Sequence, residues 1–165
     1  MKKEDFVSLM NDLEKPTLKL ASLIPDDKLD TSPIPNTMSL SGLLAHLGDS
    51  MGYIGRCLVS GEWPMHSQDR DKPVTAGKNE LMEKIRQAHQ AVRDSFEPLS
   101  QGDFETRVTQ TPWGAKGTIE MLSVAILYSH QIHHKMQLFM ALKALGIQVD
   151  TGTLYMGLEP GVMKT

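Results

Sequence analysis

Three of the six histidines of this 165-residue chain lie in one short segment, SHQIHHKMQ, residues 129–137. His130 and His134 are four positions apart, so on a helix their imidazoles project from one face and can bind one ion. His133 lies about 100° further round the helix and is a poor co-ligand. A buried histidine pair needs partners for its ring nitrogens, which a metal ion or hydrogen bonds within the core would provide. The pair predicts one of these two arrangements without choosing between them.

A third histidine would turn the pair into a metal site. His46 lies at the margin of the apolar face of the helix expected over 39–60, and His89 lies at the edge of the apolar face of the helix expected over 77–99. Periodicity alone does not choose between them. His66 lies in a polar loop, where we expect it to be solvated.

Most other catalytic motifs are missing from the sequence. It contains no HExxH, no inward ExxH pair for a di-iron bundle, no glycine-rich phosphate loop and no GxSxG turn. Cys57 is the only cysteine, which excludes a disulfide framework and a CxxC metal site. We interpret it as a buried, inert thiol. A strong metal site must therefore use histidines or carboxylates.

Four amphipathic helices are expected to position the histidines. Apolar residues at helical spacing predict helices over about 3–25, 39–60, 77–99 and 118–145. The polar link from Gly61 to Gly77 is long enough to cross a bundle, which permits parallel neighbours. Before the last helix, DFETRVTQTPWGAKGT predicts a small irregular hairpin with Trp113 at its tip. The architecture is an all-α four-helix bundle in a single domain, 1–165, with its core over about 4–150 and a C-terminal tail over 147–165.

The last predicted helix is apolar on two sides. We expect its inward face to contain Ile119, Ile126, His130, His134, Gln137, Ala141 and Leu145. The opposite face contains Met121, Ala125, Tyr128, Ile132, Met136 and Phe139. An exposed helix is not normally apolar on both sides, so the second face must meet either the C-terminal tail or another subunit. We expect a homodimer that uses this face.

Composition limits the partners and the compartment. The formal net charge is −3 and the pI is about 6.0, so the chain has no basic surface for nucleic acid. Charges interrupt every apolar run near the N-terminus, and no segment has the length of a membrane span, about 18 apolar residues. We expect a soluble cytoplasmic protein that binds neither nucleic acid nor membrane.

Two segments resemble the DinB-like family of bacterial damage-inducible proteins, which includes YfiT-type proteins and the bacillithiol-dependent and mycothiol-dependent transferases. They are MSLSGLLAHLGDS and SHQIHHKMQLFMALKALG, and the resemblance covers about 4–150. It implies a four-helix bundle with a long link between the second and third helices, and often a dimer. Its metal ligands correspond to His46, His130 and His134, so the resemblance favours His46 over His89.

The resemblance also suggests how the remaining residues contribute. The histidine next to the last ligand corresponds to His133, and Gln137 keeps the glutamine of the motif. Lys135 and Met136 replace the arginine and glycine that commonly follow the last ligand. We expect Asp49 and Tyr53, together with His133 and Gln137, to lie behind the ligands or to line the pocket, while no catalytic base is identified.

Three neutral imidazoles would leave an open coordination position on a divalent ion, with zinc or nickel favoured. Such a site can activate a water for hydrolysis or bind a thiol as thiolate. The resemblance to thiol transferases favours the second reaction. The alternatives are a metal-dependent hydrolase, a metal-binding stress-response or interaction module without turnover, and a bundle whose histidines only hydrogen-bond to one another.

Overall fold

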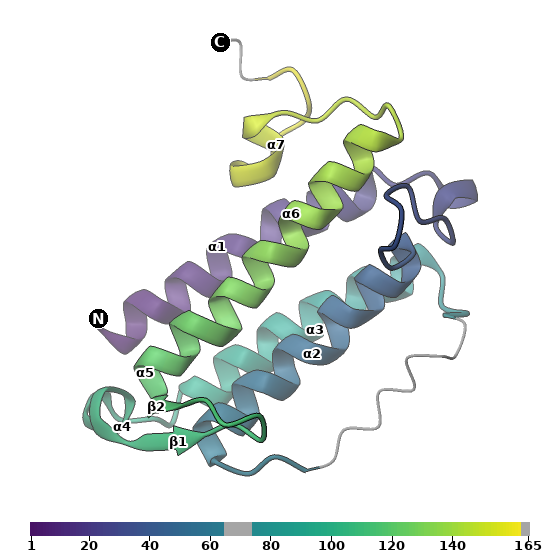
Figure 1. Cartoon of the computed structure of the whole chain (residues 1–165). Helices are drawn as coiled ribbons and strands as arrows, with labels where there is room; N and C mark the ends of the chain where they lie inside the picture. The colour runs from purple at the N-terminus through teal and green to yellow at the C-terminus, as the bar shows by residue number, and fades with distance from the viewer. Residues whose placement is uncertain (65–73, 163–165) are drawn as a thin grey trace.

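The computed structural model describes residues 1–64 and 74–162, so His66 lies outside the described residues. The predicted all-α class and the four helices are confirmed (Figure 1). The long helices are α1 (Lys3–Ser22), α2 (Leu40–Ser60), α3 (Lys78–Phe96) and a last helix composed of α5 (Ile119–Leu122), a π-helical segment (Ser123–Tyr128) and α6 (Ser129–Ala144). The smaller elements are a 3₁₀ turn (Asp26–Lys28), α4 (Gln101–Thr106), β1 (Val108–Gln110), β2 (Lys116–Thr118) and α7 (Thr151–Met156).

Helix α2 and the last helix begin and end within one residue of their predicted bounds, whereas α1 and α3 end three residues earlier than predicted. Ser39 caps α2, since its hydroxyl accepts a hydrogen bond from the Gly42 amide at 3.1 Å. Thr118 caps α5 in the same way, through the amide of Met121 at 3.2 Å. Gly61, with φ of 78°, follows the last residue of α2 in the left-handed conformation that glycine adopts readily. Because such caps depend on adjacent residues only, they were predictable without tertiary information.

The bundle contains two parallel helix pairs that run in opposite directions. Gly48 of α2 lies beside Lys84 of α3, and Gly55 lies beside Val92, so these two helices run in the same direction. The length of the link over 61–77 permits this arrangement; residues 65–73 of the link lie outside the described residues. The long last helix runs antiparallel to α2, so residues that are far apart in the sequence lie side by side on these two helices (Figure 1). None of the described helices is long and apolar enough to cross a membrane.

Three glycines of α2 allow a close approach to α3. A Cβ atom at Gly48 would lie 2.9 Å from Cβ of Lys84, and one at Gly52 would lie 3.1 Å from Cβ of Ala91. At Gly55 the nearest atom would be a methyl group of Val92, at 3.2 Å. The backbone of α2 therefore packs directly against α3, and α2 in turn carries His46.

The predicted hairpin is confirmed as an antiparallel pair, β1 and β2, with Thr109 opposite Gly117. Trp113 lies in the connecting turn and is 62% exposed. The short helix α4, which precedes the hairpin, was not predicted. Its Phe104 is fully buried, with its ring centroid 5.8 Å from that of Phe6 and 6.2 Å from that of Phe96. Six residues form too short a segment for helical periodicity to be recognised, and one buried aromatic ring anchors them.

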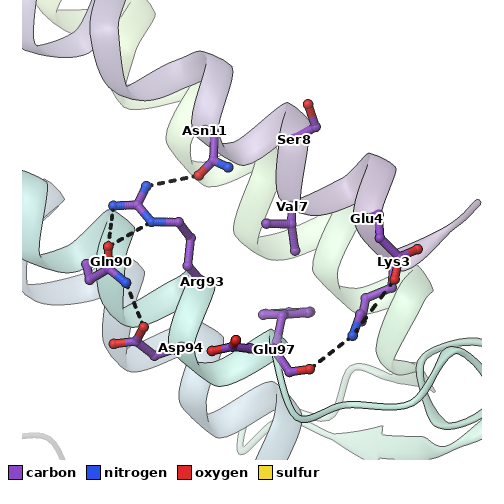
Figure 2. A pocket seen from close by; sticks show the side chains of 10 residues that line it. Lys3, Glu4, Val7, Ser8, Asn11, Gln90, Arg93, Asp94 and Glu97 are labelled. Carbon is purple, nitrogen blue, oxygen red and sulfur yellow. Dashed lines mark hydrogen bonds and ion pairs between the residues drawn. The ribbon is translucent and has the colours of Figure 1, made fainter.

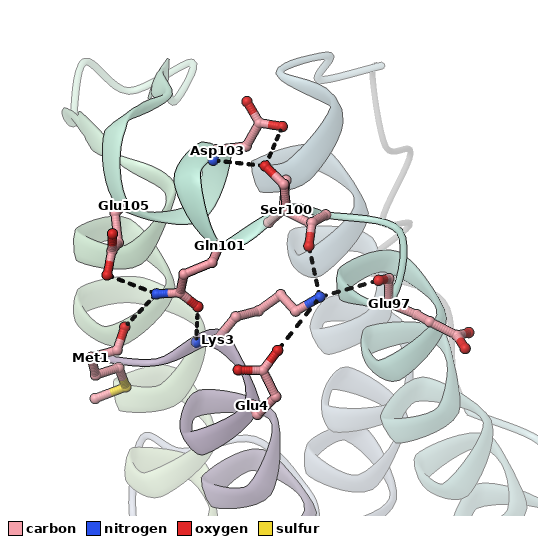
Figure 3. A network of polar contacts seen from close by, with 9 residues as sticks. Met1, Lys3, Glu4, Glu97, Ser100, Gln101, Asp103 and Glu105 are labelled. Atoms are coloured by element: carbon pink, nitrogen blue, oxygen red, sulfur yellow. Dashed lines mark hydrogen bonds and ion pairs between the residues drawn. The ribbon is translucent and has the colours of Figure 1, made fainter.

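A polar network joins the start of α1 to the segment between α3 and α4 (Figure 3). The ammonium of Lys3 donates hydrogen bonds to the carbonyls of Glu97, at 3.1 Å, and Leu99, at 2.6 Å. The amide of Lys3 donates to Oε1 of Gln101 at 2.8 Å, and the amide nitrogen of Gln101 donates to the carbonyl of Met1 at 3.2 Å. The contacts satisfy carbonyls at the end of α3 and hold the N-terminus on the bundle.

The inward face predicted for the last helix was partly wrong. Its fully buried residues include Leu127, Gln131, Leu138 and Leu142, whereas the predicted Gln137 is exposed. The π-helical segment adds a residue to the turn before α6 and so changes the angular register that a uniform α-helix would have. The prediction assumed a uniform α-helical period along the whole helix, so it assigned some of the wrong residues to the buried face.

The second apolar face is partly covered by the chain itself. Helix α7, formed by the predicted tail, packs on α1 and α6 near the end of the bundle (Figure 1). Phe139 is buried there with Leu154 of α7 in one apolar cluster. Met121 and Met136 stay 53% and 39% exposed. The C-terminal tail thus covers part of the second apolar face of the last helix. The homodimer through this face stays a prediction.

His89 is 1% exposed, between α3 and α1, and we expect it to make stability depend on pH. Burial lowers the pKa of His89 from 6.5 to about 4; nearby Glu14 opposes this shift and Arg93 reinforces it. Below pH 6.5 the unfolded chain therefore binds a proton that the folded chain excludes, so stability falls as the pH drops towards 4 and is unaffected at higher pH.

The size of this effect is about 3 kcal/mol, from the pKa shift and about 1.4 kcal/mol per pH unit. The measurement is urea unfolding of the wild type and of His89→Leu at pH 7 and pH 4. The difference in the free energy of unfolding between the two proteins should change by about this amount from pH 7 to pH 4. The carboxylates and the other histidines contribute equally to both proteins, so their effects cancel in this difference. A difference that does not change with pH would contradict the prediction.

Candidate metal centre

Helices α2 and α6 bring His46, His130 and His134 together. Nε2 of His130 lies 3.0 Å from Nε2 of His46 and 3.1 Å from Nε2 of His134. The ring centroids are 4.3 to 5.0 Å apart. All three side chains are half-buried, and one ligand atom from each lies within 4.8 Å of the others. The structure thus resolves the choice between His46 and His89 by proximity: His46 joins the pair, and His89 faces α1 instead.

The hydrogen-bond chemistry of the cluster matches a metal site better than a self-paired histidine cluster. Nδ1 of His134 lies 2.7 Å from the side-chain oxygen of Gln137, which can only accept, so Nδ1 carries the hydrogen and Nε2 has a lone pair. Both short contacts in the cluster involve Nε2 of His130, which carries at most one hydrogen in the neutral ring. One hydrogen cannot satisfy two such contacts fully, whereas a cation would use the lone pairs of all three rings.

The protonation states also favour metal binding. Burial lowers the pKa of His130 from 6.5 to about 3, and the neighbouring His134, His46 and His133 act in the same direction. Burial also lowers the pKa of His134, against the opposing effect of its hydrogen bond to Gln137. These imidazoles are neutral at pH 7, the form in which they donate a lone pair to a metal.

The distances fit a divalent ion. With metal–nitrogen bonds of about 2.05 Å, tetrahedral ligands would have nitrogens about 3.3 Å apart, and two of these separations are 3.0 and 3.1 Å in the structure. Small adjustments of the rings would complete the geometry. Within residues 1–64 and 74–162, no cysteine or carboxylate joins the three histidines, so a metal held here would keep positions open for another ligand.

The other predicted site residues, Gln137, His133, Asp49 and Tyr53, differ in their exposure and in their hydrogen bonds. Gln137 is exposed but orients His134 through its hydrogen bond, the relation that outer residues have to metal ligands. His133 and Asp49 are exposed. Tyr53 is half-buried and its hydroxyl donates to the carbonyl of Pro64 at 2.6 Å. Gln137 is therefore tied to a candidate ligand by a hydrogen bond.

Cys57 is buried, as predicted, on the same helix as His46. Burial raises the pKa of its thiol, and a hydrogen bond with Tyr53 opposes that effect. A thiol with a raised pKa is a weak nucleophile at neutral pH. The structure therefore agrees with the interpretation of Cys57 as inert.

Two buried polar residues of α6 were missed from the sequence. Gln131 is fully buried and its amide nitrogen lies 3.5 Å from the hydroxyl of Thr17 on α1. Lys135 is 5% exposed although it is adjacent to His134. A π-helical segment precedes α6, and such segments are frequent at functional sites. It would have pointed to these residues, but no sequence rule identifies a π-helical segment.

A surface groove lies away from the histidines (Figure 2). It is a groove of about 490 Å³ between α1 and α3. Its central Arg93 donates to Asn11 and Glu14, at 3.0 Å each, and to Gln90 at 2.8 Å. The guanidinium is already satisfied by these contacts, which indicates a structural role in joining the two helices.

The molecule is thus a helical bundle with a small hairpin and a candidate three-histidine metal centre. A family model for the DinB superfamily matches residues 12–138, and the chain belongs to this superfamily. The resemblance noted in the sequence is therefore confirmed. No curated protein sequence matches the chain.

Solved structures show the same fold. A DinB-like protein, YjoA of Bacillus subtilis, is 21% identical, with a TM-score of 0.68 over 88% of this chain and 94% of that one. YfiT of Bacillus subtilis, described as a probable metal-dependent hydrolase with an unusual four-helix bundle topology, is 17% identical, with a TM-score of 0.72 over 88% and 89%. A mycothiol-dependent maleylpyruvate isomerase is 13% identical, with a TM-score of 0.58 over 89% of this chain and 62% of that one.

Proposed function

We propose that the chain is a metal-dependent enzyme that activates a low-molecular-weight thiol for transfer to an electrophile. The observation that carries the proposal is the convergence of three imidazoles, from His46, His130 and His134, with no carboxylate in the described cluster. These three residues would hold the metal ion. Gln137 would keep His134 in the tautomer that binds it.

The charge of this ligand set favours an anionic ligand with a soft donor atom. Three neutral rings leave the double charge of the ion uncompensated, and a thiolate would compensate part of it. When bound, zinc or nickel would act as a Lewis acid and lower the pKa of the thiol that joins the site. The three histidines themselves would hold the ion in position and partly exclude water from it.

Hydrolysis is the alternative reaction, and the name given to YfiT supports it. A hydrolase of this kind usually needs a positioned base to guide the attacking water. Asp49, the carboxylate that the sequence predicts near the pocket, is exposed and outside the histidine cluster. Thiol transfer needs less from the protein, because a thiol loses its proton far more readily than water does. The thiol dependence of the maleylpyruvate isomerase relative agrees with this choice.

The test is turnover of the zinc-loaded or nickel-loaded protein with thiols and electrophiles. Bacillithiol, mycothiol, coenzyme A and cysteine would be offered with monobromobimane and chlorodinitrobenzene, and ester and amide substrates would be assayed in parallel. We expect thiol conjugation that is lost in His130→Ala and kept in His133→Ala. Hydrolysis without conjugation would establish the alternative reaction, and metal binding without any turnover would establish a binding module.

We also propose that the protein is a homodimer through the back face of the last helix, defined by Met121, Tyr128, Ile132, Met136 and Phe139. The exposure of Met121 and Met136, at 53% and 39%, supports this proposal, since exposed apolar side chains favour association. We expect sedimentation equilibrium to give the dimer mass for the wild type and a shift to monomer in Met121→Asp. A wild type that sediments as a monomer at all tested concentrations would reject the dimer.

A further inference from the structure

A second pocket lies on the side of α6 that faces away from the three histidines. It has a volume of about 220 Å³ and is enclosed by α1, α6 and α7, together with Tyr128 of the π-helical segment. Ile132 and Met136 line it, and on an α-helix these positions lie about 200° from His134. Leu13 and Leu154 add buried apolar walls from α1 and α7. The pocket is thus separate from the candidate metal centre, although one helix contributes to both.

Lys135 lines this pocket without an anionic partner. The residue is 5% exposed, and within residues 1–64 and 74–162 its ammonium forms no ion pair and no hydrogen bond. Its described polar contact is with the ring face of Tyr155, whose centroid is 5.5 Å away. Asp12 also lines the pocket but forms no ion pair with Lys135. A buried ammonium is costly unless a negative group compensates it, and a ring face compensates it only in part.

We propose that this pocket binds a small organic carboxylate with an apolar body, whose carboxylate pairs with the ammonium of Lys135. The apolar walls would contact the body of the ligand, and the single ammonium provides the charge complement. A phosphate or sulfate is a poorer match, because a compact, strongly hydrated anion needs several donors and would gain nothing from the walls. The pocket volume of about 220 Å³ is that of about seven liquid waters and lies below the 300 Å³ or so of pockets for drug-sized ligands.

The experiment is calorimetric titration of the full chain with phenylpropionate and with its uncharged amide. A carboxylate can also bind an open metal site, so the titration is run on chelator-treated and zinc-loaded protein. We expect one phenylpropionate to bind per chain in both states, with the amide bound at least about tenfold more weakly, as expected for the loss of a charge-assisted hydrogen bond. Binding that disappears on chelation, or equal binding of acid and amide, would overturn the proposal.

Lys135→Met is the decisive variant. It keeps the length of the side chain and removes the charge, so affinity for phenylpropionate should fall at least about tenfold while the protein stays folded. Lys143→Met is the matched control, because Lys143 lies on the same helix, is exposed, and has its ammonium 4.9 Å from the ring centroid of Phe139. This control should bind like the wild type. Equal affinity of Lys135→Met and wild type would reject the site.

A second variant protects the test against misfolding. Ile132→Phe adds bulk to the pocket wall without removing the ammonium, so it should weaken phenylpropionate binding and leave metal binding unchanged. If Lys135→Met does not fold, an Ile132→Phe protein that binds phenylpropionate as the wild type does would overturn the proposal. Tyr128, Ile132 and Met136 belong both to this pocket and to the proposed dimer face, so a dimeric wild type that binds no phenylpropionate would also overturn the proposal.

Discussion

The His130→Ala variant should lose stoichiometric metal binding. His130 Nε2 is the atom that contacts both other rings, at 3.0 and 3.1 Å, so its removal leaves His46 and His134 without the ligand between them. Structural sites with four ligands bind zinc with a free energy of about 10–16 kcal/mol, so each ligand contributes about 3 kcal/mol. The loss of one ligand therefore weakens the affinity for the metal about a hundredfold or more. The measurement is elemental analysis of purified protein, followed by competition with a chromogenic chelator.

His133→Ala is the matched control for this experiment. It removes an imidazole from the same turn of α6, but the side chain of His133 is exposed and lies outside the described cluster. This variant should keep wild-type metal content and affinity. A wild type without stoichiometric metal would discard both the enzyme and the metal-binding module, and would leave the histidines as a polar cluster of the bundle. Equal losses in the two variants would mean that the bound metal is held by some other arrangement.

The Gly48→Leu variant should lose about 3 kcal/mol of stability. A Cβ atom at this position would already lie 2.9 Å from Cβ of Lys84 and 3.3 Å from its backbone carbon, so a larger side chain must push α2 away from α3. Overpacking of this kind costs about 1–3 kcal/mol, and for a chain of this length a loss of 3 kcal/mol lowers Tm by about 10 °C. Thermal unfolding followed by circular dichroism checks the result.

Gly102→Leu gives the comparison for Gly48→Leu. Both glycines are helical with negative φ, but a Cβ atom at Gly102 has no neighbour closer than 4.0 Å. Because leucine has the higher helix propensity, this control should be neutral or stabilised by about 0.5–1 kcal/mol. Gly48 also lies two residues from His46, so displacement of α2 should weaken metal binding in Gly48→Leu alone. Equal stability of the two variants would show that the close approach of α2 and α3 is not required.

The chemistry of neighbouring residues was enough to predict the long helices. Ser39, Thr118 and Gly61 act through atoms a few residues away, and the apolar periodicity of the long helices follows from burial of one face. The spacing of His130 and His134 likewise predicts that they share a direction on one helix. The resemblance to the DinB-like family added His46, which no local rule could have chosen over His89.

Tertiary packing determined the features that the sequence pattern missed. A π-helical segment over Ser123–Tyr128 precedes α6, and Gln131 and Lys135 of α6 are buried, which a uniform α-helical period did not predict. Helices α4 and α7 have six residues each, so their stability comes from contacts such as those of Phe104 and Leu154 rather than from propensity.

The sequence alone therefore specified an all-α bundle with two histidines on one helix face, because helix formation, capping and side-chain direction depend on residues close in the chain. The structure placed His46, the histidine that the resemblance implies, beside that pair, and it placed Lys135 in an apolar pocket on the other side of the same helix. The physical reason is that both features depend on distances between helices that are separated in the chain by tens of residues. Such distances are set by packing of whole faces, including the glycines that bring α2 against α3.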